Sequence, residues 1–164
     1  MGPLAKQVPS LRLSRRPRGN QPLHIYVAGQ LVIPLRHWFY PSDVAWSEEG
    51  HRFAWRMKLR DKDANLTLFA RDPVTGTFHP IEPRQWLTAR QVSKMATRPD
   101  MIHQFAHFVA DEAERRGEPR PQITAIALVS LNGGPTSPMI DPTIDLAREP
   151  YRLGAARWIL PQAP

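Results

Sequence analysis

The chain has 164 residues, which is enough for one domain with a hydrophobic core and too few for two of ordinary size. It contains no cysteine, so disulfide bonds, thiol nucleophiles and cysteine-ligated zinc sites are excluded. The formal net charge is +7, and eighteen prolines predict many turns and short elements.

The amino-terminal segment, residues 1–21, has the composition of a flexible basic arm without a periodic apolar pattern. It carries five cationic side chains, Lys6, Arg12, Arg15, Arg16 and Arg18. Residues 22–164 hold the other seventeen lysines and arginines against fifteen acidic residues, a balance of +2. No signal peptide is predicted, and the longest apolar stretch, residues 25–35, is shorter than the roughly twenty residues of a membrane span.

Residues 23–38 predict an amphipathic helix, because apolar side chains recur at intervals of three and four, and Pro34 is expected to end or kink it. A turn follows at residues 41–43. Residues 51–60 then alternate between apolar and cationic side chains, which is typical of a strand. Residues 66–70 alternate again, and a turn at 72–76 leads to a third short strand near Phe78. These strands indicate an antiparallel meander.

Two helices are predicted next, one after an N-cap at Thr88 and one over residues 100–116, capped by Asp100 and ended by Gly117. The apolar stripe of the second helix is Met101, Phe105, Phe108 and Val109. Residues 123–131 predict a buried strand, and the tail has five apolar anchors: Ile140, Ile144, Leu146, Trp158 and Ile159. The expected fold is α+β, a small, mostly antiparallel sheet with an N-terminal amphipathic helix and two further helices packed on it.

Six segments follow one another in an order that carries more information than any of them alone. They are PLRHWFYP at 34–41, WSEEGHRFAWRMKLRD at 46–61, RPDMIHQFAHFVADE at 98–112, SLNGGP at 130–135, IDPTIDLA at 140–147 and WILP at 158–161. Together they resemble the soluble region that follows the membrane (HTTM) helices in the vitamin K-dependent γ-glutamyl carboxylase family, bacterial members included. The resemblance implies that residues 22–164 form a carboxylase-like soluble C-terminal domain.

The family adds carbon dioxide to the γ-carbon of a peptide glutamate, using reduced vitamin K and oxygen to generate the base. Its catalytic lysine belongs to the membrane helices, so the resemblance implies no catalytic residue and no bound cofactor in this chain. We expect the chain alone to be inactive, and Lys58, Lys62 and Lys94 to be surface charges. The resemblance also implies a location on the extracytoplasmic face of the membrane, with a glutamate-containing peptide and a helical membrane domain or partner chain as partners.

The resemblance assigns substrate contact to the segment from His51 to Arg60, where Trp55 matches a tryptophan of the animal enzymes. His51 stands at a tyrosine position and Arg60 at a histidine position, and both changes keep hydrogen-bonding groups. The ordinary alternative is a strand with a solvated cationic face. Arg36, His37 and Trp38 are the expected junction with the membrane domain, or else a helix end with a favourable C-terminal cation.

Other polar residues have mainly structural interpretations. His103 and His107 are spaced i, i+4 as in some zinc sites, but helix-surface histidines are favoured and no metal is predicted. Asp141 is expected to fix a turn and Asp145 to pair with an arginine. The alternative function is a module that binds an anionic surface or nucleic acid through its arginine-rich arm, although no nucleic-acid motif is present.

Overall fold

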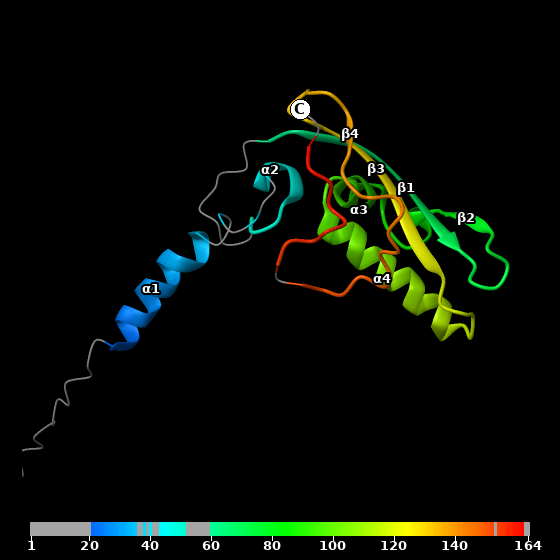
Figure 1. Ribbon diagram of the computed structural model, residues 1–164, viewed down its shortest axis with the longest axis horizontal. Helices are drawn as coiled ribbons and strands as arrows, with labels where there is room; N and C mark the ends of the chain where they lie inside the picture. Colours follow the sequence, from blue (N-terminus) through cyan, green and yellow to red (C-terminus); the bar gives the residue numbers. More distant parts are fainter. Residues whose placement is uncertain are drawn as a thin grey trace, which may run out of the picture.

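The framework of the domain is a four-stranded antiparallel sheet with the strand order β2-β1-β3-β4 (Figure 1). The computed structural model describes residues 21–35, 38, 40, 43–51, 60–152 and 154–162. The strands are β1 (Lys62–Arg71), β2 (Phe78–Ile81), β3 (Gln122–Leu131) and β4 (Ser137–Pro138). β1 and β3 pair over their whole lengths, from Lys62 opposite Leu131 to Arg71 opposite Gln122. The predicted α+β fold is confirmed.

The hairpin between β1 and β2 forms where the sequence predicts a turn. The Asp72 carboxylate accepts hydrogen bonds from the backbone N–H groups of Val74 (2.7 Å) and Thr75 (3.2 Å). Gly76 has a φ of 72°, a conformation that glycine adopts without strain. The first strand of the expected meander falls largely on residues 52–59, which lie outside the described residues. The second neighbour of β1 is β3, which follows in sequence only after the helices.

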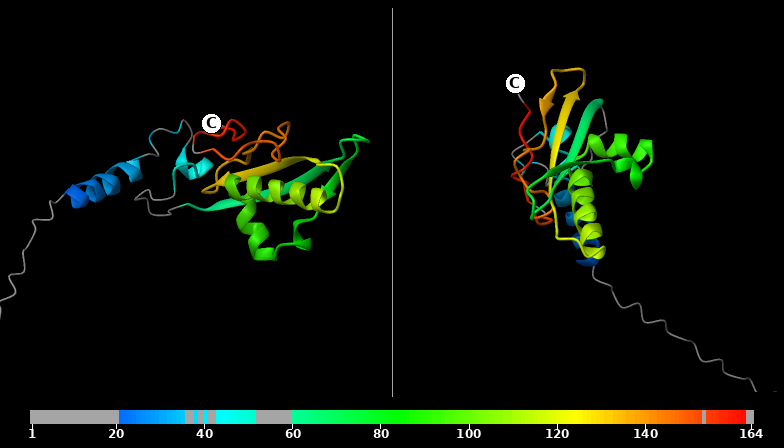
Figure 2. Two further views of the ribbon diagram at one scale, coloured as in Figure 1. Left: turned by 90° about the horizontal axis from the view of Figure 1, so that it is seen from below. Right: turned by 90° about the vertical axis from the view of Figure 1, so that its right-hand side faces the viewer.

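The helices η2 (Pro83–Gln85), α3 (Ala89–Ala96) and α4 (Pro99–Arg115) connect β2 to β3, and α3 and α4 lie on one face of the sheet (Figure 2). Thr88 and Gln91 form a capping box at the start of α3, as expected. The predicted N-cap at Asp100 is wrong, because Pro99 begins α4 and Arg98 occupies the cap position. Gly117, with a φ of 80°, follows the end of α4 as predicted.

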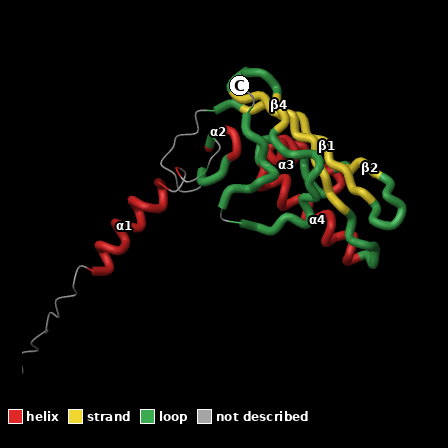
Figure 3. Tube along the Cα trace, in the orientation of Figure 1, coloured by secondary structure: helices red, strands yellow, loops and turns green. Residues whose placement is uncertain are grey.

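Two helices precede the sheet, and Figure 3 shows both by secondary structure. Helix α1 (Gln21–Leu35) forms where a helix was predicted, but its apolar side chains lie on all sides rather than along one stripe, and it extends away from the sheet (Figure 1). Helix α2 (Val44–Ser47) is a single turn capped by the Asp43 carboxylate, which accepts a 2.8 Å hydrogen bond from the Ala45 N–H.

The core lies between the inward face of the sheet, α4 and the carboxy-terminal segment. Its largest fully buried side chains include Trp46, Leu68, Ile102, Met139 and Leu146. The carboxy-terminal segment follows the edge of β3, because the backbone N–H groups of residues 139 and 146 donate to carbonyls of residues 127 and 123. The Trp46 indole N–H donates to the Leu160 carbonyl at 2.7 Å, so the segment also closes on α2. The five expected tail anchors are buried or packed against the core, namely Ile140, Ile144, Leu146, Trp158 and Ile159.

The two faces of β3 differ more than its apolar sequence predicts. Ile123 and alternate residues after it are buried, whereas Ile126 and Leu128 are 43% and 42% exposed. The expected buried strand is therefore buried on one face only, because helices cover that face alone (Figure 2). The stripe of α4 is also shifted, with Ile102, Phe105, Ala106, Val109 and Ala110 buried and Phe108 exposed.

Because β3 is buried on one face only, the same substitution is expected to lower the free energy of unfolding by different amounts on its two faces. Ile123→Ala is expected to lower the free energy of unfolding by about 2–5 kcal/mol, because it leaves a cavity in the core. The matched variant Ile126→Ala, on the opposite face, is expected to change it by less than about 1 kcal/mol. Urea unfolding of both variants measures the difference, and equal losses would contradict the assignment of the faces.

Candidate carboxylate-binding site

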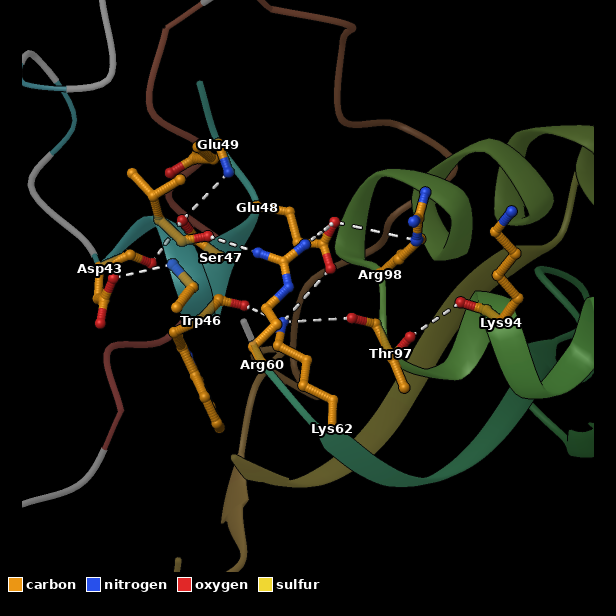
Figure 4. A network of polar contacts seen from close by, with 12 residues as sticks. Asp43, Trp46, Ser47, Glu48, Glu49, Arg60, Lys62, Lys94, Thr97 and Arg98 are labelled. Carbon is orange, nitrogen blue, oxygen red and sulfur yellow. Dashed lines mark hydrogen bonds and ion pairs between the residues drawn. The ribbon is translucent and has the colours of Figure 1, made fainter. Parts of the chain in front are cut away.

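Four charged side chains from separate parts of the chain meet beside α2 and form what we call the Glu48 cluster: Glu48, Arg60, Lys62 and Arg98 (Figure 4). Glu48 follows α2, Arg60 precedes β1, Lys62 is the first residue of β1, and Arg98 is the N-cap of α4. The cluster therefore joins three elements at one end of the sheet.

The Glu48 carboxylate is the centre of these contacts. Arg60 Nη2 lies 2.8 Å from Glu48 Oε2, without the angle of a hydrogen bond, so the contact is an ion pair. Lys62 Nζ lies 3.7 Å from Oε1, and Arg98 Nε lies 3.9 Å from Oε2. Three cations thus surround one carboxylate, and the described part of the chain places no second carboxylate within ion-pair distance of them.

The cations also bind backbone carbonyl groups, two in α2 and one at the end of α3. Arg60 Nη1 donates to the Val44 carbonyl at 3.2 Å, and Lys62 Nζ donates to the carbonyls of Trp46 and Thr97. Cations at the C-terminal end of a helix interact favourably with its unpaired carbonyls. This arrangement explains how α2, a helix of one turn, is held against β1.

Glu48 adopts a left-handed backbone conformation with a φ of 62°. Glycine is favoured at such a helix end, and another residue is strained there by about 1 kcal/mol. A glutamate at this position is therefore explained by its side chain, which supplies the cluster with its carboxylate.

The cluster is largely removed from water. The side chains of Lys62, Arg60 and Glu48 are 4%, 7% and 9% exposed, while Arg98 is 23% exposed. Burial lowers the pKa of Lys62 to about 8, and the charges of Arg60 and Arg98 act in the same direction, whereas Glu48 opposes them. Lys62 was expected to be a surface charge, and that expectation is wrong. Lys94 is exposed, and Lys58 lies outside the described residues.

A cavity of about 290 Å³ lies beside the cluster and shares Glu48 with it. Its wall is formed by residues near α2, by the first two turns of α4 and by residues 149–152 and 154–159. The charged residues of this wall are Glu48, Glu49, Asp100, Glu149, Arg152 and Arg157. Glu49 holds the two sides together, since its carboxylate accepts a 2.7 Å hydrogen bond from the Ala156 N–H. The wall thus carries four acidic and two basic side chains, and Glu48 is the cluster member that lines it.

Two histidines fix the far side of this cavity. His103 Nε2 and His107 Nε2 lie 2.7 and 2.8 Å from the Glu149 carbonyl oxygen and 3.2 Å from each other. Because a carbonyl only accepts, both nitrogens carry protons in this arrangement, and their mutual contact is not a hydrogen bond. His103 also stacks on Trp158 at 5.2 Å between ring centroids.

His103 was expected on the helix surface and is instead buried, which lowers its pKa below the usual range; the charge of His107 contributes in the same direction. Within the described ranges no three potential metal-ligating side chains converge.

Asp145 accepts a hydrogen bond from the Ile123 N–H and pairs with Arg148 at 3.3 Å, and Asp141 fixes its turn by accepting from the Thr143 N–H. Both expectations for these aspartates are confirmed.

Only some of the residues predicted to contact substrate or the membrane domain lie within the described residues. His51 is half-buried and its backbone N–H donates to the Glu48 carbonyl at 3.2 Å, so His51 lies beside the cluster, of which Arg60 is a member. Trp55 lies outside the described residues, as do Arg36 and His37 of the predicted junction. Trp38 is described and is 74% exposed. The roles predicted for all six residues remain predictions.

Sequence reasoning missed Glu48, Lys62 and Arg98. One local signal was available: Lys62 shares the parity of Leu66 and Leu68, whose side chains point into the core. Parity therefore placed Lys62 on the inward face of β1 despite its charge. Glu48 and Arg98 carried no comparable signal, because their partners are distant in sequence.

The fold and the site define a small α+β domain with a cavity, lined in part by charged residues, beside a largely buried cluster of charged side chains. No helix in the described part of the chain is long and apolar enough to cross a membrane. The profile described as "Vitamin K-dependent gamma-carboxylase, lumenal domain" matches residues 19–164, and the chain belongs to this family. The resemblance seen in the six segments is confirmed. No solved structure matches the chain.

Burial of Lys62 predicts a specific dependence of stability on pH. Its pKa is lower in the folded chain (about 8) than in the unfolded chain (10.5), so the penalty for its buried charge is complete below pH 8 and is lost as the pH rises toward 10.5. The free energy of unfolding of the wild type minus that of Lys62→Met should rise by about 2 kcal/mol between pH 8 and pH 10. Denaturant unfolding at each pH measures it. The exposed Lys94→Met is the control and should give no such rise; a flat difference for Lys62 would contradict its burial.

His103 predicts a second dependence at acidic pH. Because its folded pKa lies below the usual 6.5, the stability that depends on its neutral form is present above pH 6.5 and is lost as the pH falls through the folded value. His103→Gln keeps an N–H donor for Glu149 but does not titrate, so part of the acid destabilisation should disappear. Thermal unfolding at pH 7 and pH 5 tests this against the exposed His79→Gln. Identical acid sensitivity in the wild type and His103→Gln would refute it.

Proposed function

We propose that this chain is an extracytoplasmic domain that binds a glutamate-containing peptide for a vitamin K-dependent carboxylase, with a substrate carboxylate held at the Glu48 cluster. The observation that supports this most directly is the imbalance of charge in the largely buried Glu48 cluster, in which Arg98 is the most exposed member. Arg60, Lys62 and Arg98 carry three positive charges, and Glu48 carries one negative charge. Buried charges are costly unless they are paired, so the cluster favours a further anion.

Glu48 is positioned to act as an internal substitute for the substrate carboxylate. It has the same functional group as the proposed ligand, and it both lines the cavity and pairs with the cations. A peptide in the cavity reaches Arg98, the most exposed of the cations, when the Glu48 side chain turns away. The guanidinium groups of Arg60 and Arg98 then bind the incoming carboxylate, which matches their planar geometry.

The substrate site predicted from the resemblance is compatible with this location. Arg60 is a member of the cluster, and His51 lies two residues beyond Glu49, which lines the cavity. Trp55 is proposed as the apolar contact for the peptide. A solvated outer face remains the ordinary explanation for the other arginines of this segment.

The chemistry of the parent enzyme is proposed to occur elsewhere. The cavity wall carries six charged residues, which do not fit an apolar quinone, and we derive no step through reduced vitamin K, oxygen or carbon dioxide in this domain. These are proposed to act in a helical membrane domain or partner chain. Catalysis by this chain alone is not expected, and its proposed location is the extracytoplasmic face of the membrane, in keeping with the lumenal domain that names its family.

Peptide titration of the full chain tests the carboxylate site. A glutamate-containing peptide should bind measurably by calorimetry, and the same peptide with glutamine in place of glutamate should bind much more weakly. Glu48→Gln removes the internal carboxylate while keeping its size, so the glutamate peptide should bind about tenfold more tightly to this variant, equivalent to about 1.4 kcal/mol. The same variant should be less stable, because the cluster loses its only described anion.

Glu49→Gln is the matched control, since Glu49 lines the same cavity but is not a member of the cluster. Unchanged or weaker peptide binding by Glu48→Gln would mean that the cluster is structural or that Glu48 itself contacts the peptide. Trp55→Ala separately tests the predicted aromatic contact and should weaken binding. Deletion of residues 1–20 should leave peptide affinity unchanged, whereas the nucleic-acid alternative predicts loss of nucleic-acid binding after the same deletion.

A further inference from the structure

Helix α1 exposes an unusual amount of apolar surface. Its large apolar side chains are between 42% and 74% exposed, with Leu35 at the lower limit and Ile25 at the upper. The others are Leu23, Tyr26, Val27, Leu31, Val32 and Ile33. Soluble monomers rarely expose a contiguous apolar patch of this kind, so we expect α1 to lie against an apolar partner or in lipid.

The distribution of these side chains distinguishes between environments. At 100° per residue, Leu23 and Val27 lie on one side of the helix, Ile25 and Val32 on the opposite side, and Tyr26 between them. A groove in a protein covers one side of a helix, whereas lipid contacts every side that enters it. Figure 1 and the left view of Figure 2 show α1 apart from the sheet and from α3 and α4. The apolar surface is therefore exposed all round.

The length of α1 limits the way in which it enters lipid. Fifteen residues of α-helix are about 22 Å long, and the hydrocarbon core of a bilayer is about 30 Å thick. The helix therefore does not reach across the bilayer, which leaves insertion from one surface.

The charge of the surrounding sequence indicates the type of lipid. Residues 1–42 contain Lys6, Arg12, Arg15, Arg16, Arg18 and Arg36 and no aspartate or glutamate, and the first acidic residue of the chain is Asp43. Helix α1 itself carries no charged side chain. An apolar helix in an entirely cationic segment is complementary to a surface with anionic headgroups. The exposed Trp38, just beyond the helix, is of the residue type enriched at the level of the headgroups.

We infer that α1 inserts into one surface of an anionic lipid membrane, with the arginines before it paired with lipid phosphates. This inference does not depend on the carboxylate site. It also differs from docking on a helical protein domain, which would require that protein for any binding to occur.

Vesicle flotation of the full chain tests the inference with two compositions, phosphatidylcholine alone and phosphatidylcholine mixed with phosphatidylglycerol. The wild type should float with the mixed vesicles and should partition more weakly into the neutral ones. Ile25→Asp with Val32→Asp places charges on two exposed apolar positions, so it should reduce partitioning by about tenfold or more without unfolding the domain. Brominated lipids should quench Trp38, and Trp38→Phe should lose that part of the quenching.

Val74→Asp is the matched control, because Val74 is 78% exposed in the β1–β2 hairpin and should not enter lipid. Glutamine at Arg12, Arg15, Arg16 and Arg18 should remove the preference for phosphatidylglycerol and its sensitivity to salt, while weak partitioning remains. Three results would overturn the inference: no flotation of the wild type with either vesicle, flotation of Ile25→Asp with Val32→Asp equal to that of the wild type, or flotation with no quenching of Trp38. The first would indicate a protein partner instead, and the second adsorption through the arginines alone.

Discussion

The arrangement of α2, β1 and α4 depends on one buried carboxylate. Glu48 is the point at which cations from the start of β1 and the cap of α4 meet the end of α2. The same contact positions Trp46, whose indole N–H reaches the carboxy-terminal segment at Leu160. Since α2 has a single turn, its own hydrogen bonds contribute little to its stability. The ion pairs and the burial of Trp46 therefore determine where α2 lies.

Stability alone does not account for such a cluster. Replacing a buried ion pair by well-packed apolar side chains is often neutral or stabilising, whereas removing one partner is costly. Here the charges do not balance as in a simple pair, because Lys62 and Arg60 are buried, and Arg98 is partly buried, around only one described carboxylate. Glu48 also occupies a backbone conformation that favours glycine. The unbalanced charge of the cluster and the left-handed backbone of Glu48 both lower the stability of the folded chain. A role in binding therefore explains Glu48 better than a role in folding does.

The elements that depend on local signals were predictable from the sequence, and the site was not. The capping box at Thr88, the turn at Asp72 and the end of α4 at Gly117 all follow from residues within a few positions of one another. The partners of Glu48 lie twelve to fifty residues away, and nothing local relates them. The burial of His103 likewise depends on Trp158 and the Glu149 carbonyl, which the fold supplies from the far end of the chain.

The two proposed surfaces are compatible in space, although each rests on its own evidence. About ten residues separate Trp38 from Glu48, and a chain of that length spans at most about 35 Å even when fully extended. If α1 enters lipid, the Glu48 cluster is held within that distance of the membrane surface. A peptide carboxylate bound there would be close to any helical domain in the same bilayer. The chain then raises the local concentration of substrate beside a membrane-embedded catalyst, a contribution that requires no catalytic residue of its own.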